Sequence, residues 1–185
     1  SYIEIHPSQE LLYAVSELSD GGGLISSYAI DPLTGSLNYI NQQTTGDEGP
    51  CHLSINTSGD VVAVANYSGG SITTLPIDSD GSLGQPTGFI KHHGSSINTH
   101  RQEGPHPHSA NIDPFNKNLL VPDLGLDKVM VYPINTETGT LTELTPSWAE
   151  TTPGAGPRHL AFHTNHNLVY VINELDSTIT AFKYD

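Results

Sequence analysis

The sequence contains one short segment three times: Gly49-Pro50-Cys51-His52, Gly104-Pro105-His106-Pro107-His108 and Gly156-Pro157-Arg158-His159. The copies begin 55 and then 52 residues apart. Each copy is followed by a short apolar stretch and then by a polar turn, such as Asn56-Thr57-Ser58-Gly59. Self-similarity at a period of this length is typical of proteins built from a repeated structural unit. The chain therefore reads as copies of a unit of about 50 residues.

Each unit contains the same succession of apolar runs and turns. The runs that follow the polar turn are residues 11–15, 61–65, 119–122 and 168–172. Runs this short, rich in Val, Leu and Tyr and bounded by turn residues, predict buried strands. A third run follows in each unit, and Met130-Tyr132-Ile134 shows the two-residue spacing of one face of a sheet. A Gly-containing hairpin turn and a fourth short strand come next, as in Thr34-Gly35-Ser36-Leu37.

Four antiparallel strands per unit, with no helical pattern between units, predict an all-β fold: a β-propeller with about four blades present. The predicted units are residues 1–48, 49–103, 104–155 and 156–185, and the last stops after its third strand. No strand before Ser1 completes it, so we expect part of a larger ring. The alternatives are a four-bladed ring and an antiparallel sandwich. A sandwich does not require the whole unit to recur, which favours the propeller.

The charge balance limits the classes of partner. The 185 residues include 20 acidic and 6 basic side chains, for a formal net charge of −14. This argues against a nucleic-acid groove and against binding to an anionic membrane surface. We expect no transmembrane helix, because no run of about 18 apolar residues occurs. The start of the chain lacks a signal-peptide pattern, and the lone Cys51 precludes an intrachain disulfide, so we expect a cytoplasmic protein.

Polar residues gather at one predicted end of the units. The Gly-Pro segments precede the first strand, and a polar pair follows the second strand, which runs antiparallel to the first. Both sets should therefore meet at the same rim, where loops commonly carry function. The residues expected there are His52, His106, His108, Arg158, His159, Asn66, Asp123, Asn173 and Glu174.

Both arginines of the chain, Arg101 and Arg158, fall in these rim segments. Guanidinium groups bind carboxylate or phosphate in a bidentate manner, so the pair indicates an anion site. The alternative is a structural salt bridge from Arg158 to Glu174 or Asp176. Glu174 ends an apolar run, and we expect its pKa to be raised by partial burial unless a cation such as Arg158 offsets it.

Five of the ten histidines lie between His92 and His108, which raises the question of a metal. No Cys pair or HExxH motif accompanies them, and we predict neither metal nor other cofactor. We interpret His92, His93 and His100 as parts of a solvated polar loop. His106 and His108 are better placed as hydrogen-bond donors at the rim. We assign Cys51 a structural role.

Several stretches together resemble a known family. They are residues 156–163, 170–175, 104–109, 121–129 and 65–71. They resemble the seven-bladed propeller lactonases, which include propeller-type 6-phosphogluconolactonases and the fungal carboxy-cis,cis-muconate lactonizing enzyme. The resemblance runs along the whole chain, which covers about half of such a ring. It implies that His108 (or His106), Arg158 and Glu174 belong to an active site; a further family arginine lies in a later blade.

The resemblance implies metal-independent hydrolysis of a small anionic sugar lactone such as 6-phosphogluconolactone, a step of the pentose phosphate pathway. Arg158 would bind the anion or the developing oxyanion, Glu174 would act as general base on water, and His108 would donate a hydrogen bond or a proton. The substrate-binding residues would be His106, His159, Asn66, Asp123, Asn173 and Arg101. Two alternatives stay open: a muconate-type lactonizing cycloisomerase and a non-catalytic propeller that binds a partner at its rim.

Overall fold

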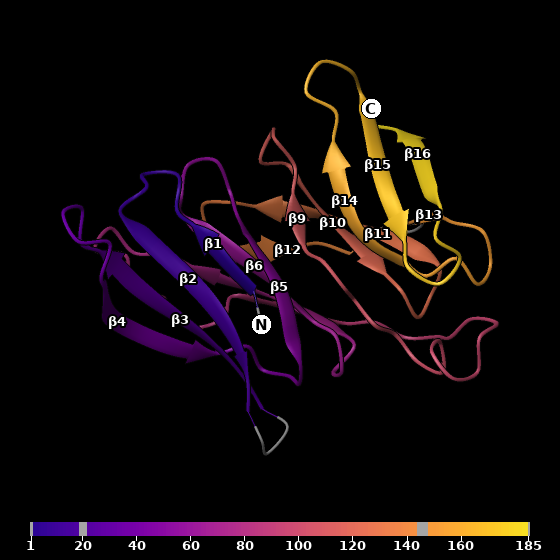
Figure 1. Ribbon diagram of the computed structural model, residues 1–185, viewed down its shortest axis with the longest axis horizontal. Coiled ribbons are helices and arrows are strands. Elements are labelled where there is room, and N and C mark those ends of the chain that lie inside the picture. Colours follow the sequence, from indigo (N-terminus) through magenta and orange to yellow (C-terminus); the bar gives the residue numbers. More distant parts are fainter. Residues whose placement is uncertain (1, 19–21, 144–147, 185) are drawn as a thin grey trace.

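The computed structural model describes residues 2–18, 22–143 and 148–184, and they form four antiparallel sheets that stand side by side (Figure 1). The first sheet contains β1 (Tyr2–Ile5), β2 (Leu11–Glu17), β3 (Gly23–Ile30) and β4 (Leu37–Thr44). The second contains β5 (Pro50–Ile55), β6 (Val61–Asn66), β7 (Ser71–Pro76) and β8 (Gly88–Lys91). In both sheets the spatial order of the strands follows their order in the chain.

The third sheet contains β9 (Asn111–Ile112), β10 (Asn118–Asp123), β11 (Lys128–Asn135) and β12 (Thr140–Leu141), and β13 (Trp148–Glu150) also pairs with β11. The fourth contains β14 (Pro157–Phe162), β15 (Leu168–Asn173) and β16 (Ile179–Lys183). Each sheet repeats the up-and-down path of the one before it. The described part of the chain contains no helix that is long and apolar enough to cross a membrane.

The hydrophobic core lies between neighbouring sheets. Val62 and Val64 of β6 pack against Tyr13 and Val15 of the first sheet. Their neighbours in β6 face the other way, and Ala63 and Ala65 join the cluster shared with the third sheet. A third cluster joins the third and fourth sheets. A sandwich has two facing sheets, whereas here each inner sheet packs against two neighbours, so the propeller prediction is confirmed.

This packing explains the apolar runs in the sequence. Every residue of β6 is buried, because sheets cover both of its faces. Strand β15, in the last sheet, alternates instead: Val169 and Val171 are buried, while Tyr170 and Ile172 are exposed. A continuous apolar run thus indicates a strand covered on both faces, and alternation indicates a strand covered on one.

The fourth strands depart most from the sequence prediction. Strand β4 runs over eight residues, whereas β12 has only two. Leu83 follows the turn at Gly81, where the same hairpin pattern predicts a fourth strand, but it makes only an isolated bridge with Ile77, and β8 begins at Gly88. The carbonyl of Leu83 instead accepts hydrogen bonds from the side chains of Asn41 and Gln43. A contact with the neighbouring sheet therefore replaces the local ladder at this point.

Candidate active site

The Gly-Pro segments and the polar pairs meet at one end of the sheets. Strand pairing places Pro50 opposite Asn66 and Pro157 opposite Asn173. Pro107 and Asp123 form an isolated bridge of the same kind. A cavity of about 340 Å³ lies at this end. Its lining residues are Glu17, Gly49, Cys51, Tyr67, Ser68, Arg101, His108, Arg158 and Glu174.

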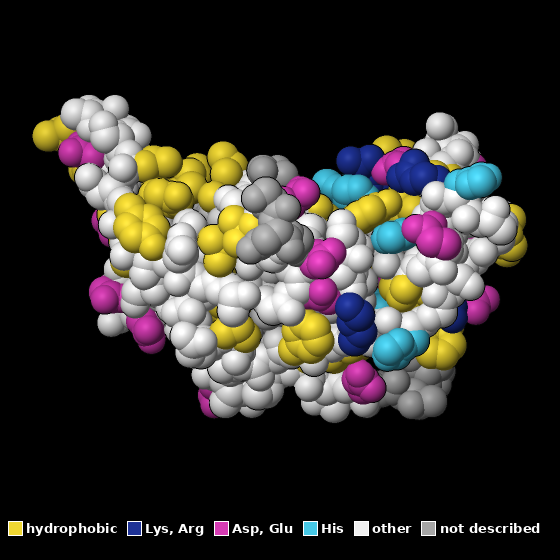
Figure 2. All heavy atoms as spheres, turned by 90° about the horizontal axis from the view of Figure 1, so that it is seen from below, with side chains coloured by type: hydrophobic (Ala, Val, Ile, Leu, Met, Phe, Trp, Pro, Cys, Tyr) yellow, Lys and Arg dark blue, Asp and Glu magenta, His cyan; other side chains and the backbone are white. Residues whose placement is uncertain are grey.

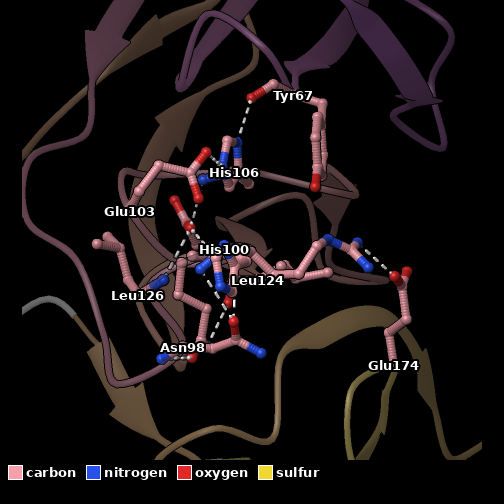
Figure 3. Close-up of polar contacts among 12 residues, drawn as sticks. Tyr67, Asn98, His100, Glu103, His106, Leu124, Leu126 and Glu174 are labelled. Carbon is pink, nitrogen blue, oxygen red and sulfur yellow. Dashed lines mark hydrogen bonds and ion pairs between the residues drawn. The ribbon is translucent and has the colours of Figure 1, made fainter.

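Glu174 is the central charged group of this cavity. Its Oε1 accepts a hydrogen bond from Arg101 Nη2 at 2.6 Å, and its Oε2 accepts one from Arg158 Nη1. His108 Nε2 lies 3.9 Å from the same Oε2. Close ion pairs therefore join both arginines to one carboxylate. In Figure 3 Glu174 lies across from the loop that carries Asn98 and His100, and a dashed line joins its carboxylate to a guanidinium group.

The loop before β9 holds Arg101 in place. Asn98 Oδ1 accepts hydrogen bonds from the backbone N–H groups of His100 and Arg101. The fully buried Gln102 donates its side-chain amide to the carbonyl of Leu124 at 2.9 Å. The exposed guanidinium of Arg101 is therefore carried by a turn that the buried Gln102 anchors to Leu124. Figure 2 shows basic, acidic and histidine side chains gathered at one edge of the surface.

Arg158 and Glu174 are brought together by backbone pairing. Glu174 N donates to the carbonyl of Gly156 at 2.7 Å. A bulge between Pro157 and His159 interrupts the register of β14 and β15. Bulges turn a side chain away from its regular direction and are common near functional sites. The bulge falls at Arg158, whose side chain remains 45% exposed.

The charges around Glu174 set its protonation. Partial burial alone would raise the pKa of Glu174, but the hydrogen bond from Arg101 and the charge of Arg158 together lower that pKa below its ordinary value. The expectation that a cation offsets burial is thus met by two arginines. The side chains of Tyr67 and Glu174 raise the pKa of Arg101 above its usual range. At neutral pH the cavity therefore holds an ionised carboxylate and two guanidinium ions.

Three histidines stand beside this charged group. His108 lies between Tyr67 and His159, with ring centroids 5.1 and 5.5 Å away, and His159 packs edge-on against His52. Burial and the nearby Arg158 lower the pKa of His108 to about 4, and burial and neighbouring histidines lower that of His52 to about 3. These rings are therefore neutral at pH 7. Among the described residues no three His, Cys, Asp or Glu groups have the arrangement of a metal site.

Three residues predicted to bind substrate have buried side chains. Asn66 and Asp123 are fully buried, and Asn173 is 2% exposed. Asn66 Nδ2 donates to the hydroxyl groups of Ser71 and Thr73, within its own sheet. These three side chains therefore lie within the sheets and do not line the cavity.

The prediction that His92 belongs to a solvated loop is wrong. Its side chain is fully buried, with Nδ1 2.6 Å from Asp123 Oδ2 and Nε2 2.9 Å from the hydroxyl of Tyr132. His93 and His100 are exposed, as predicted. His106 stacks on the ring of Tyr67 at 4.5 Å and faces Glu103, so it lies beside the cavity (Figure 3).

Sequence reasoning did not assign Tyr67 or Glu17 to the site, although both line the cavity. The signal that marks them is positional: Glu17 ends β2, while Tyr67 and Glu174 directly follow β6 and β15. Cys51 also lines the cavity, with Sγ 4.0 Å from His108 Nδ1. Burial raises its pKa to about 12, which keeps the thiol protonated and agrees with a structural role.

Repeated antiparallel sheets of three to five strands, with a charged cavity at one end, define this chain as a β-propeller. Residues 1–185 match the family described as "Lactonase, 7-bladed beta-propeller", and the chain belongs to that family.

Known proteins similar to the chain agree with this membership. It is 36% identical over 186 residues to the 6-phosphogluconolactonase of Bacillus subtilis (strain 168), covering 100% of the chain and 51% of that protein. The 6-phosphogluconolactonase of Formosa agariphila is 33% identical over 98% of the chain and 52% of its own length. The structure of Pseudomonas aeruginosa periplasmic gluconolactonase superposes with a TM-score of 0.89 at 32% identity, over 100% of the chain and 53% of that protein. The chain thus spans about half the length of these relatives.

Proposed function

We propose that the complete protein hydrolyses a small anionic sugar lactone, most closely 6-phosphogluconolactone, without a metal. The observation that carries the proposal is the contact of Arg101 and Arg158 with one ionised carboxylate in an open cavity. Two guanidinium groups suit a phosphorylated or carboxylated substrate. Relatives named 6-phosphogluconolactonase over the whole length of the chain support the same substrate class.

Glu174 is the proposed general base. Its two oxygens accept hydrogen bonds from the arginines in the free protein. An anionic substrate that binds these arginines would compete for them, which frees a carboxylate oxygen to take a proton from water as the water attacks the lactone carbonyl. The pKa of Glu174 would then rise toward its ordinary value, because the positive charges are shared with the substrate.

Arg158 is the proposed stabiliser of the oxyanion or of the substrate's anionic group, and His108 the proposed donor of a hydrogen bond to the ring oxygen. When the ring C–O bond breaks, the leaving oxygen takes the proton that Glu174 removed from water. His108 is neutral near pH 7 and has a ring N–H to donate. Arg101, which lines the cavity, and His106 and His159, which lie beside it, are the proposed substrate-binding residues. A partly buried, neutral His of this kind orients the leaving oxygen without adding charge.

The test is turnover of 6-phosphogluconolactone by the complete protein and by its Glu174→Gln variant. We expect a loss of roughly 10²- to 10⁴-fold in kcat, the range for removal of a general base. Muconate lactonization is assayed in parallel, since a cycloisomerase would use the same cations. Unchanged lactone hydrolysis in Glu174→Gln would sink the assignment, and absence of turnover by the unaltered protein would favour a non-catalytic binding role.

We propose a cytoplasmic location for the protein. The lone Cys51 supports it, because a free thiol suits a reducing compartment. The Pseudomonas aeruginosa relative carries the word periplasmic in its name, so location differs within similar proteins. Fractionation of the native organism with an antibody against the protein decides the question, and recovery in the periplasm would contradict the proposal.

A further inference from the structure

Asp127 is a buried carboxylate in the turn between β10 and β11, outside the cavity. It is 5% exposed and has a positive φ of 54°. Its Oδ2 accepts hydrogen bonds from Ser96 Oγ at 2.5 Å and Gly154 N at 2.6 Å. Its Oδ1 accepts one from Gly156 N at 2.8 Å. A single carboxylate therefore joins two loops that come from distant parts of the sequence.

Both loops lead to an arginine of the site. Ser96 opens the loop that carries Arg101, and Ser96 N donates to the carbonyl of Gln102 at 3.0 Å. Gly156 lies two residues before Arg158, and its carbonyl accepts the backbone N–H of Glu174. Asp127 is therefore hydrogen-bonded to the loops that support Arg101, Arg158 and Glu174.

We propose that Asp127 is the positioning residue that holds Arg101 and Arg158 against Glu174. The inference rests on the proposed function for its kinetic consequence, but the geometry it predicts is independent of any activity. Asp127 acts through the two loops and makes no contact with a substrate. Without it, the loops lose a shared anchor, and the arginines lose their common position on Glu174.

The variant Asp127→Asn separates this role from general packing. The amide has the same shape but only one acceptor oxygen, whereas both oxygens of Asp127 accept backbone N–H groups. Either Gly154 N or Gly156 N therefore loses its partner. Ser96→Ala removes only the bond on the Arg101 side and retains the rest.

Asp113→Asn is the matched control. Asp113 is 1% exposed in the turn before β10, and it accepts backbone N–H groups from Phe115, Lys117 and Asn118. It therefore has the same burial and the same type of bonding. The control differs in its position, because the hydrogen bonds of Asp113 go to residues 115–118 and Tyr184 rather than to the loops that carry Arg101 and Arg158.

The direct readout is the pKa of the Glu174 carboxyl, measured by carbon-13 NMR titration of the complete protein. The charged and titratable groups that face it are Arg101, Arg158, His108, His159, Tyr67 and Glu17. Because the arginines lower this pKa, their displacement in Asp127→Asn should raise it by about 1 unit. Ser96→Ala should raise it by less, and Asp113→Asn should leave it unchanged.

The kinetic readout is kcat/KM for the lactone against pH. We expect Asp127→Asn to lower kcat/KM roughly 10- to 100-fold through misplaced arginines. The acid limb of its profile should move to higher pH, since a carboxylate with a raised pKa is protonated sooner as pH falls. An unshifted Glu174 pKa in Asp127→Asn, or an equal shift in Asp113→Asn, would overturn the inference.

Two further outcomes are decisive. If Asp127→Asn does not fold, an unshifted Glu174 pKa in Ser96→Ala overturns the inference, and a partial shift supports it. If the unaltered protein does not hydrolyse lactones, the proposed function fails. The NMR titration then still decides whether Asp127 positions the arginines.

Discussion

Two turns at the same end of neighbouring sheets follow the same backbone course and do different work. The β10–β11 turn runs from Asp123 to Asp127, and the β15–β16 turn from Asn173 to Ser177. Asp127 and Ser177 occupy the same position and have positive φ angles of 54° and 59°. The second residue differs most: Leu124 is fully buried, whereas the Glu174 side chain is 21% exposed and binds both arginines. The same turn thus serves as a support in one sheet and as a reactive group in the next.

The first residue of each turn explains why the two turns differ in their hydrogen bonding. Asn173 donates its amide to the hydroxyls of Thr178 and Thr180, five and seven residues later. Lys128 and Met130 occupy those positions in the third sheet and offer no hydroxyl. Asp123 stands at the first position of this turn, and its carboxylate accepts the backbone N–H groups of Gly125 and Leu126 in its own turn and of His106 in the segment before β9. The following strand therefore decides whether the turn is bonded within its own sheet or binds other loops.

The largest expected effect comes from exchanging the second residues. Leu124→Glu places an unpaired carboxylate in a fully buried position, which should lower the free energy of unfolding by about 4–5 kcal/mol. The reverse change, Glu174→Leu, should alter it by only about 1 kcal/mol, because its ion pairs are partly exposed. Urea denaturation of the complete protein measures both. Equal losses of unfolding free energy in Leu124→Glu and Glu174→Leu would contradict the distinction between a supporting turn and a reactive turn.

The first residues should show an intermediate difference. Asp123 Oδ1 accepts hydrogen bonds from the N–H groups of His106, Gly125 and Leu126, so Asp123→Ala leaves buried donors without partners. We expect a loss of about 2–4 kcal/mol. Asn173→Ala leaves only hydroxyl groups, which can rotate to other acceptors, and should cost about 1 kcal/mol. Thermal or urea unfolding compares the two variants, and a larger loss for Asn173→Ala would contradict our reading of the turns.

The smallest effect concerns the strand after the supporting turn. Lys128 Nζ lies 4.2 Å from the ring centroid of Trp148, across the β11–β13 pair. The contact is at the surface, so Lys128→Ala should lower the free energy of unfolding by about 0.5–1 kcal/mol. Lys128→Arg, which keeps a cation over the ring, is the control and should change less. A loss of unfolding free energy above about 2 kcal/mol in Lys128→Ala would show that the contact with Trp148 also stabilises the β10–β11 turn.

Much of the fold could be predicted from the sequence because strand signals are local. The run 61–65 corresponds to β6 (Val61–Asn66), and the run 168–172 to β15 (Leu168–Asn173). The fourth strands were harder to predict, since pairing with a neighbouring sheet replaces their local pattern near Leu83. His92 was misjudged for a similar reason. Its partners, Asp123 and Tyr132, lie 31 and 40 residues away in the chain.

The sequence by itself determined the repeated strands, the end at which polar segments meet and the family. Alternation of apolar residues and turn-forming residues acts over a few positions, so it can be read without coordinates. Only the tertiary structure decided that Arg101 reaches Glu174 across 73 residues, that Tyr67 and Glu17 line the cavity, and that Asp127 joins two loops. Those contacts depend on how whole sheets pack side by side, and a local sequence pattern does not predict which distant residues meet.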